Sequence, residues 1–280
     1  ALGTTLAYNF EGELWSRKGR LDLGVEWRKD NGTREYWNLM EGYGRTKGAK
    51  TTDDDVEFFT TSFYGEFSYQ ILKQFRVILG SRYDMFTGTL DRMDGSSYDN
   101  DGPRIYSPKA GVIYSPFAYL DLYANYGKGF ALPSTVNYST RDYLEPAIRT
   151  QYEFGLRARP TTWSDLSLAF WRLDTTDDFQ TSPTNPDLQV NAGETRREGI
   201  EFSANARFWK HLSLRLNYAY TNSEYLNYYT GGVHYDGNEL RYTPHHIFNI
   251  ELSWQPPDKG WGGRINYRYQ SAGYIDYANT

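Results

Sequence analysis

The chain has 280 residues, 18% of them aromatic, and a formal net charge of −5. An acidic balance without a basic block excludes the electrostatic footprint of a nucleic-acid-binding protein. The absence of cysteine excludes disulfides and thiolate chemistry. No apolar run approaches the roughly 20 residues that a membrane-spanning helix needs.

Taken in chain order, the sequence consists of about twelve runs in which apolar and polar residues alternate. Successive side chains of a strand point to opposite faces, so each run predicts a strand with one apolar and one polar face. The apolar positions include Leu6, Tyr8, Phe10 and Leu14; Leu21, Leu23, Val25 and Trp27; Phe75, Val77, Leu79 and Tyr83; Leu120, Leu122, Ala124 and Tyr126; Tyr152, Phe154 and Leu156; Ile200, Phe202, Ala204 and Ala206; and Leu212, Leu214, Leu216, Tyr218 and Tyr220.

The polar face of these runs carries charges of both signs, for example Glu26, Arg82 and Asp84. Burying such charges in a dry core is costly, whereas a water-filled or plugged lumen accepts them. We therefore expect one face to contact lipid and the other to line a lumen. The expected lipid-facing residues include Leu214, Leu216, Phe248, Ile250, Leu252 and Tyr267, and the expected lumen-facing residues include Arg215, Asn249, Glu251 and Arg268.

The connections between the runs alternate between short and long. Short turns are predicted near 16–19, 72–74, 115–118, 159–165, 209–211 and 255–260, and long loops at 29–55, 88–104, 130–145, 175–191 and 225–240. A soluble sandwich shows the same alternation of side chains, but this alternation of connections is typical of a membrane barrel with short periplasmic turns and long extracellular loops. The predicted fold is an all-β, transmembrane, antiparallel up-and-down β-barrel.

Tryptophan placement and hydropathy agree with a barrel. Of eight tryptophans, five lie within or beside the short turns: Trp15, Trp163, Trp209, Trp254 and Trp261. Indole side chains favour the membrane–water boundary, so these residues predict an aromatic belt at the periplasmic rim. The mean hydropathy of −0.73 is compatible with a membrane protein because only alternate residues of a barrel strand need to be apolar.

Five segments, in order, resemble those of TonB-dependent outer-membrane receptors. They are Gly-Ser-Arg-Tyr-Asp at 80–84, Ser-Pro-Lys-Ala-Gly-Val-Ile-Tyr-Ser-Pro at 107–116 with Leu-Tyr-Ala-Asn-Tyr-Gly-Lys-Gly-Phe at 122–130, Leu-Glu-Pro at 144–146 with Tyr-Glu-Phe-Gly-Leu-Arg at 152–157, Asn-Ala-Gly-Glu-Thr-Arg-Arg-Glu-Gly-Ile-Glu-Phe at 191–202, and Leu-Arg-Tyr-Thr-Pro-His-His at 240–246. The resemblance is closest to the ferric-siderophore receptor branch.

The resemblance implies a twenty-two-stranded barrel around an N-terminal plug domain that carries a TonB box. Neither element precedes Ala1, and the chain stops at Asn279-Thr280 rather than at a terminal aromatic residue. Twelve strands alone would leave two unpaired edges in lipid, where no water can satisfy them. We therefore expect residues 1–280 to form an internal part of the barrel domain, with the plug and the last strands absent.

Enzymatic and metal sites are not expected. No nucleophile elbow or phosphate-binding glycine pattern is present. His245 and His246 are adjacent in a strand, so they point to opposite faces and cannot bind one metal together. The acidic segments 53–55 and 91–101 offer oxygen ligands for Ca²⁺, but their spacing does not match an EF-hand loop, and solvated loop carboxylates are the favoured interpretation.

Ligand capture by the extracellular loops is the expected activity, with no resident cofactor. Aromatic rings and guanidinium groups suit an anionic ferric chelate. The candidate ligand-binding residues are Tyr36, Trp37, Tyr43, Arg45, Tyr138, Arg141, Tyr143, Tyr225, Tyr228, Tyr229 and Tyr235. The alternative for each tyrosine is that its ring packs the loops against each other.

The resemblance therefore predicts a receptor in the bacterial outer membrane that binds an iron–siderophore-type chelate and imports it with TonB-supplied energy. Its implied partners are the TonB–ExbB–ExbD complex, reached through the plug, the ferric siderophore and the outer-membrane lipid or lipopolysaccharide, but no nucleic acid. Two alternatives stay open. One is a passive porin-like channel, and the other is TonB-dependent uptake of haem, cobalamin or an oligosaccharide.

Overall fold

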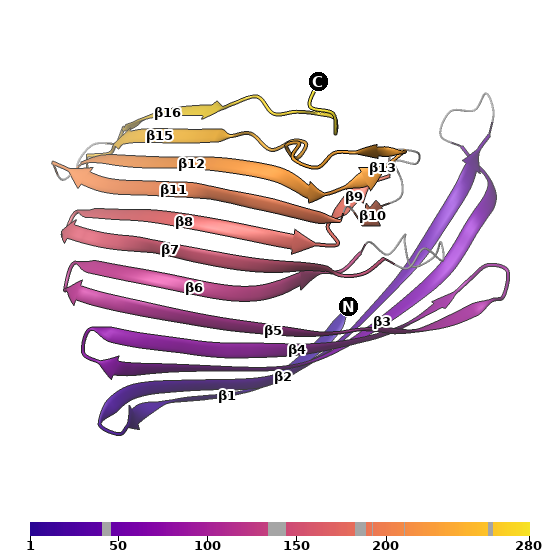
Figure 1. Ribbon diagram of the computed structural model, residues 1–280, viewed down its shortest axis with the longest axis horizontal. Coiled ribbons are helices and arrows are strands. Elements are labelled where there is room, and N and C mark those ends of the chain that lie inside the picture. Colours follow the sequence, from indigo (N-terminus) through magenta and orange to yellow (C-terminus); the bar gives the residue numbers. More distant parts are fainter. Residues whose placement is uncertain (41–45, 134–143, 183–188, 192, 210, 257–259) are drawn as a thin grey trace.

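The structure is a computed structural model that describes all residues except 41–45, 134–143, 183–188, 192, 210 and 257–259. Its main element is one twelve-stranded antiparallel sheet (Figure 1). The strands of this sheet are β1 (Leu2–Leu14), β2 (Arg17–Leu39), β3 (Lys47–Leu72), β4 (Phe75–Asp91), β5 (Ser97–Phe117), β6 (Leu120–Ala131), β7 (Ala147–Thr161), β8 (Ser164–Thr176), β11 (Glu194–Phe208), β12 (Leu212–Asn227), β15 (His246–Trp254) and β16 (Gly263–Gln270).

Each strand of the main sheet pairs with the next one along the chain, which confirms the up-and-down topology. Two small hairpins lie within the long connections: β9 (Phe179–Thr181) with β10 (Gln189–Asn191), and β13 (Tyr229–Thr230) with β14 (Val233–His234). The short connections between consecutive strands all lie at one end of the sheet, on the left of Figure 1, and the long ones lie at the other end. The prediction that the two kinds of connection occupy opposite rims is thus confirmed.

Two of the predicted long loops are instead extensions of strands. The segment 29–55 is mostly the continuation of β2 and β3, and 88–104 is mostly the continuation of β4 and β5. Both hairpins project at the right of Figure 1. Polar pairs across the first hairpin explain the extension: Thr33 Oγ1 donates to Asp55 Oδ1 at 2.8 Å, and Arg34 pairs with Asp54. Because these strands stand in water, they carry no apolar face that the sequence pattern could reveal.

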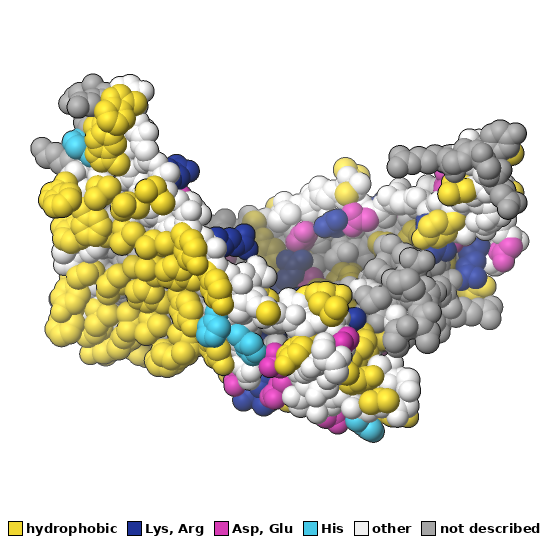
Figure 2. Space-filling model, turned by 90° about the horizontal axis from the view of Figure 1, so that it is seen from above, with side chains coloured by type: hydrophobic (Ala, Val, Ile, Leu, Met, Phe, Trp, Pro, Cys, Tyr) yellow, Lys and Arg dark blue, Asp and Glu magenta, His cyan; other side chains and the backbone are white. Residues whose placement is uncertain are grey.

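The register of the sheet keeps apolar residues opposite apolar residues. Between β12 and β15, Leu214 lies opposite Leu252 and Leu216 opposite Ile250, while Arg215 lies opposite Glu251. β16 continues the same order, with Tyr267 opposite Ile250. The predicted lipid-facing and lumen-facing residues therefore share one face each. Figure 2 shows a continuous hydrophobic surface over the half of the molecule that carries the short turns.

Large apolar side chains stay exposed along the sheet because they face the lipid rather than a protein core. The tryptophans at the short turns follow this rule: Trp15, Trp163, Trp209 and Trp261 have 80%, 50%, 85% and 64% of their surface exposed. Trp254 packs against Trp261, with 4.9 Å between the ring centroids. Within the described part of the chain, no helix has the length and apolar character needed to cross a membrane.

Candidate functional site

The extracellular end of the sheet contains six of the predicted ligand-binding residues within the described part of the chain. Tyr36 and Trp37 lie in the extension of β2, and Tyr225 lies near the end of β12. The other three lie on the connection from β12 to β15: Tyr228, Tyr229 and Tyr235. The other predicted residues, Tyr43, Arg45, Tyr138, Arg141 and Tyr143, lie outside the described residues.

The β2–β3 hairpin presents an aromatic and cationic group near its tip. The ammonium groups of Lys47 and Lys50 each lie 4.9 Å from the centroid of the Trp37 ring. Arg34 lies 5.6 Å from the centroid of Tyr36, whose side chain is half exposed. Cations held over rings in this way give a surface that combines stacking with positive charge.

Carboxylates on the same hairpin hold Lys50 and Arg34 in place. Lys50 Nζ lies 2.6 Å from Glu35 Oε1 and 2.9 Å from Asp53 Oδ2. The hydrogen bond from Lys50 lowers the pKa of Glu35, and the hydrogen bond to Glu35 raises the pKa of Lys50. Both groups therefore stay charged over the physiological range, and Asp53 acts here as an ion-pair partner. Each carboxylate of the acidic segment 53–55 thus has a partner on the hairpin: Asp53 pairs with Lys50, Asp54 pairs with Arg34, and Asp55 accepts the hydrogen bond from Thr33.

Two of the predicted tyrosines, Tyr225 and Tyr228, are buried rather than exposed. Only 0% and 2% of their surface is accessible, and their ring centroids are 4.9 Å apart. Tyr277 packs on Tyr228 at 5.0 Å, and the Arg241 guanidinium lies 3.9 Å from the centroid of Tyr277. Burial raises the pKa of Tyr225 to about 12 and also raises that of Tyr228. These two rings pack the loop internally, which is the alternative that the sequence left open, and they offer no face to a ligand in this conformation.

The other two tyrosines of this loop are more accessible. Tyr229 has 59% of its surface exposed, and its ring contacts the His234 ring at a tilt, with 4.7 Å between the centroids. Tyr235 is half-buried against Tyr277, with 5.5 Å between the ring centroids. Tyr229 is therefore the residue of this group that can contact a ligand directly. A ligand-binding role for any of the predicted residues stays a prediction.

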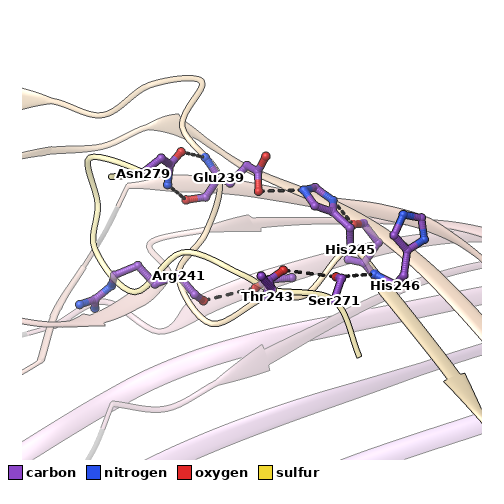
Figure 3. A network of polar contacts seen from close by, with 9 residues as sticks. Glu239, Arg241, Thr243, His245, His246, Ser271 and Asn279 are labelled. Carbon is purple, nitrogen blue, oxygen red and sulfur yellow. Dashed lines mark hydrogen bonds and ion pairs between the residues drawn. The ribbon is translucent and has the colours of Figure 1, made fainter. Parts of the chain in front are cut away.

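Polar contacts fix this loop to the wall of the barrel (Figure 3). His245 Nε2 lies 2.8 Å from Glu239 Oε2, and His245 Nδ1 lies 2.9 Å from the Thr221 carbonyl oxygen on β12. The Glu239 backbone N–H donates to Asn279 Oδ1 at 2.7 Å. His246 instead contacts the Tyr218 hydroxyl at 3.0 Å, so the two histidines point to different partners, as expected from their adjacent positions in a strand.

Arg241, Tyr277 and Asn279 were not identified as part of this region from the sequence. They contact residues far away in the chain, and such contacts leave no local pattern. Arg241 lies in the segment 240–246, one of the five segments that resemble TonB-dependent receptors. This resemblance is the one sequence signal that could have identified Arg241.

The polar face of the sheet carries the ion pairs expected of a lumen wall. Arg82 bridges Glu26 at 3.0 Å and Asp84 at 2.8 Å, and the buried Ser62 hydroxyl donates to Asp84 Oδ1 at 2.6 Å. Lys109 pairs with Glu66 on the same face. Among the described residues, no three histidine, aspartate or glutamate side chains come together in a way that could hold a metal ion. These carboxylates are therefore structural ion-pair partners.

Together, the up-and-down sheet, its apolar outer face, its charged inner face and the tryptophans at its short turns define a wall of an outer-membrane β-barrel. The sequence profile described as "TonB dependent receptor-like, beta-barrel" matches residues 1–280. The chain belongs to this family, whose members are outer-membrane receptors and transporters rather than enzymes.

Solved structures of the family share the fold. The ferric citrate transporter FecA in its unliganded form superimposes with a TM-score of 0.84 at 17% identity, covering 99% of this chain and 42% of FecA. The ferric preacinetobactin receptor BauA from Acinetobacter baumannii gives a TM-score of 0.76 at 18% identity, covering 99% of this chain and 44% of BauA. At these identities the likeness establishes the fold alone.

Curated relatives have slightly higher identity. The metal-pseudopaline receptor CntO of Pseudomonas aeruginosa is 23% identical over 193 residues, which are 65% of this chain and 27% of CntO. The ferric-pyoverdine M114 receptor PbuA of Pseudomonas sp. (strain M114) is 26% identical over 206 residues, which are 67% of this chain and 24% of PbuA. The matched part of this chain thus corresponds to about a quarter of each relative.

Proposed function

We propose that this chain is part of a receptor that captures an iron–siderophore-type chelate at its extracellular end and imports it with energy supplied through TonB. The observation that carries the proposal is the pair of lysine ammonium groups over the Trp37 ring, with Tyr36 exposed beside it. Rings and fixed cations bind anionic, aromatic-rich chelates by stacking and charge-assisted hydrogen bonds. The names of the relatives, which include receptors for ferric catecholate, ferric citrate and ferric pyoverdine, support the same ligand class.

We propose further that residues 1–280 are an internal part of a twenty-two-stranded barrel that encloses a plug domain. β1 and β16 are the outer strands of the sheet and do not pair with each other in the described structure. A sheet edge exposed to lipid would leave unsatisfied backbone groups, so other strands are required to close the barrel. In this proposal the plug occupies the charged lumen and contacts the TonB–ExbB–ExbD complex.

The test of ligand capture compares two pairs of aromatic residues at opposite ends of the full-length receptor. Replacing Tyr36 and Trp37 by alanine should weaken binding of labelled ferric siderophores by about 10-fold or more, because stacked and cation–π contacts are lost. The matched control is Phe117→Ala with Tyr119→Ala, a stacked pair beside a short turn with 56% and 50% of its surface exposed. This control should leave binding unchanged.

Uptake by intact cells separates the proposed transporter from its alternatives. Uptake of the bound chelate should stop in a TonB-deficient strain. Uptake that persists there would favour the passive channel, and binding of haem, cobalamin or an oligosaccharide without binding of any ferric siderophore would favour the other transporters. Equal binding of the ferric siderophores by the Tyr36/Trp37 variant and by the control would show that the β2–β3 hairpin is not part of the capture site.

A further inference from the structure

Both nitrogens of the His245 ring lie against hydrogen-bond acceptors at the extracellular end of the wall (Figure 3). Nδ1 lies 2.9 Å from the backbone carbonyl oxygen of Thr221, and Nε2 lies 2.8 Å from Glu239 Oε2. A carbonyl oxygen only accepts hydrogen bonds, so Nδ1 carries a proton in this arrangement. A carboxylate also only accepts, so the contact with Nε2 requires a second proton. The His245–Glu239 contact therefore needs one proton more than a neutral imidazole and a carboxylate carry together.

Loss of that proton makes the His245–Glu239 contact unfavourable. A neutral His245 ring that still donates from Nδ1 to Thr221 directs the lone pair of Nε2 at the Glu239 carboxylate, and two acceptors at this distance repel each other. Turning the ring to remove the repulsion gives up the hydrogen bond to Thr221. The side chains of His245 and Glu239 are each 31% exposed, so water replaces the lost contact only in part. The observed arrangement thus belongs to the protonated pair.

The other titratable groups near the His245 ring do not supply a substitute for this proton. Glu224 pairs with Glu239 in a backbone bridge, so it brings a second carboxylate to the same place. The rings of His246 and Tyr220 have their centroids 6.4 Å and 6.2 Å from that of His245, beyond hydrogen-bond contact. Charged groups of the neighbouring segments have other partners, which are Tyr277 for Arg241 and Thr280 for Asp276.

Glu239 lies where three segments of the chain meet. Its backbone pairs with Glu224 at the end of β12, and its N–H and carbonyl groups both bond to the side-chain amide of Asn279, at 2.7 Å and 3.1 Å. The contact with His245 adds the residue that precedes β15. Breaking this contact therefore loosens the β12–β15 connection and the segment 271–280 together, while the buried cluster around Tyr225 keeps its packing.

We infer that His245 and Glu239 form a proton-dependent latch between the β12–β15 connection and the barrel wall. Histidine is the side chain whose charge ordinarily changes between about pH 5 and 8. The latched form binds one proton more than the released form, so the latch is complete at mildly acidic pH and is lost as pH rises and His245 deprotonates. The connection lies at the extracellular end, so the pH of the external medium controls it. The inference is independent of which ligand the receptor carries.

The experiment measures hydrogen–deuterium exchange of the full-length receptor in lipid nanodiscs between about pH 5.5 and 8.5, the range in which histidine titrates. An unstructured peptide of the same sequence corrects for the intrinsic effect of pH on exchange. Protection of the segment 238–246 should fall by about 10-fold across this range, since a one-proton transition permits at most about 10-fold per pH unit. The segment 223–229, which contains Tyr225, should keep its protection, so local release is distinguished from opening of the whole loop.

Three variants separate the proton from the side chains that hold it. In Glu239→Gln, the new amide donates to a neutral Nε2 and accepts from a protonated one, so the segment 238–246 should stay protected at every pH tested. In His245→Gln, the pH dependence should disappear because the titrating ring is gone. The matched control is His246→Gln, which changes the adjacent ring that contacts the Tyr218 hydroxyl and should keep the pH dependence.

Four results would overturn the inference. They are protection of 238–246 that does not vary with pH in the unchanged receptor, pH dependence that persists in Glu239→Gln, pH dependence that persists in His245→Gln, and loss of the pH dependence in His246→Gln. If His245→Gln does not fold, Glu239→Gln decides alone, because it preserves the size of the side chain and its hydrogen bond to the ring.

Discussion

The buried tyrosines at the end of β12 and just beyond it show how one side chain can stabilise a loop by packing and have its own ionisation suppressed by burial. Tyr225 is fully buried between Tyr228 and Tyr277. Placing a phenolate in such a low-dielectric environment is unfavourable, which is why the pKa of Tyr225 rises to about 12 from a usual value of 10.0. The phenol therefore stays neutral at physiological pH and serves as a packing group.

The pH dependence of this loop follows from that shift. An unfolded loop releases the Tyr225 proton near pH 10.0, whereas the folded loop keeps it until about pH 12. The stabilisation is complete below pH 10 and is lost as pH rises through this window, because the unfolded state then binds fewer protons. Tyrosinate absorbance combined with limited proteolysis should show the loop opening in this range.

The variant Tyr225→Phe serves as the control for this titration. It keeps the ring contacts and removes the ionisable hydroxyl, so opening between pH 10 and 12 should be reduced. Proteolysis of this variant that rises over the same range as in the unchanged receptor would contradict the assignment to Tyr225.

At the scale of whole elements, glycines on the polar face allow aromatic rings of neighbouring strands to lie flat on the backbone. A Cβ atom on Gly155 of β7 would lie 2.4 Å from the Leu168 carbonyl oxygen and 2.8 Å from the Tyr123 ring. Tyr123 is directly opposite Gly155 on β6 and also carries the Arg157 guanidinium at 4.9 Å from its centroid. This glycine thus couples β6, β7 and β8.

Replacing Gly155 by alanine should destabilise the barrel by about 1–3 kcal/mol, because backbone and ring must both move to admit the methyl group. Gly127 of β6 provides a matched control, since nothing lies within 4 Å of a Cβ atom there. Gly127→Ala should change the stability by less than about 0.5 kcal/mol. Urea unfolding of the full-length receptor in lipid vesicles measures both values, and similar losses would contradict the packing described here.

The two faces of β12 give a second prediction for elements. Leu214→Arg places a charge in the bilayer and should cost on the order of 2–4 kcal/mol, whereas a change on the lumen face should cost much less. Asn217, opposite Asn249 on the polar face, is the matched position. Folding equilibria into bilayers compare Leu214→Arg with Asn217→Arg, and equal costs would show that the faces are assigned wrongly.

The orientation of the whole wall can be tested with single cysteines, because the sequence contains none. Met93, in the connection from β4 to β5, has 57% of its surface exposed. Lys73 lies in the turn between β3 and β4, at the opposite rim. In a full-length receptor without other cysteines, Met93→Cys should react with a membrane-impermeant maleimide on intact cells, and Lys73→Cys should react only after the outer membrane is opened. The reverse result would invert the topology.

The strands and their faces could be predicted from the sequence because both depend on the order of residues within one short stretch of the chain. A side chain points to one face or the other according to its parity, so Leu212, Leu214 and Leu216 specify a lipid-facing strand without reference to any partner. The short turns follow in the same way, since they interrupt the alternation. The tryptophans near these turns were correctly predicted to lie at one rim of the barrel. The prediction works because the depth of a residue in the membrane changes steadily with its position along the strand.

Only the tertiary structure decided how far the strands extend and which loop side chains are buried. Arg34 and Asp54 are polar residues in a region that reads as a loop, yet they pair across the β2–β3 hairpin. Tyr225 and Tyr229 are four residues apart and equally suited to a ligand by composition, but contact with Tyr277 buries the first and leaves the second exposed. Cross-strand pairing and burial depend on residues distant in the chain, and a local pattern of alternation contains no information about them.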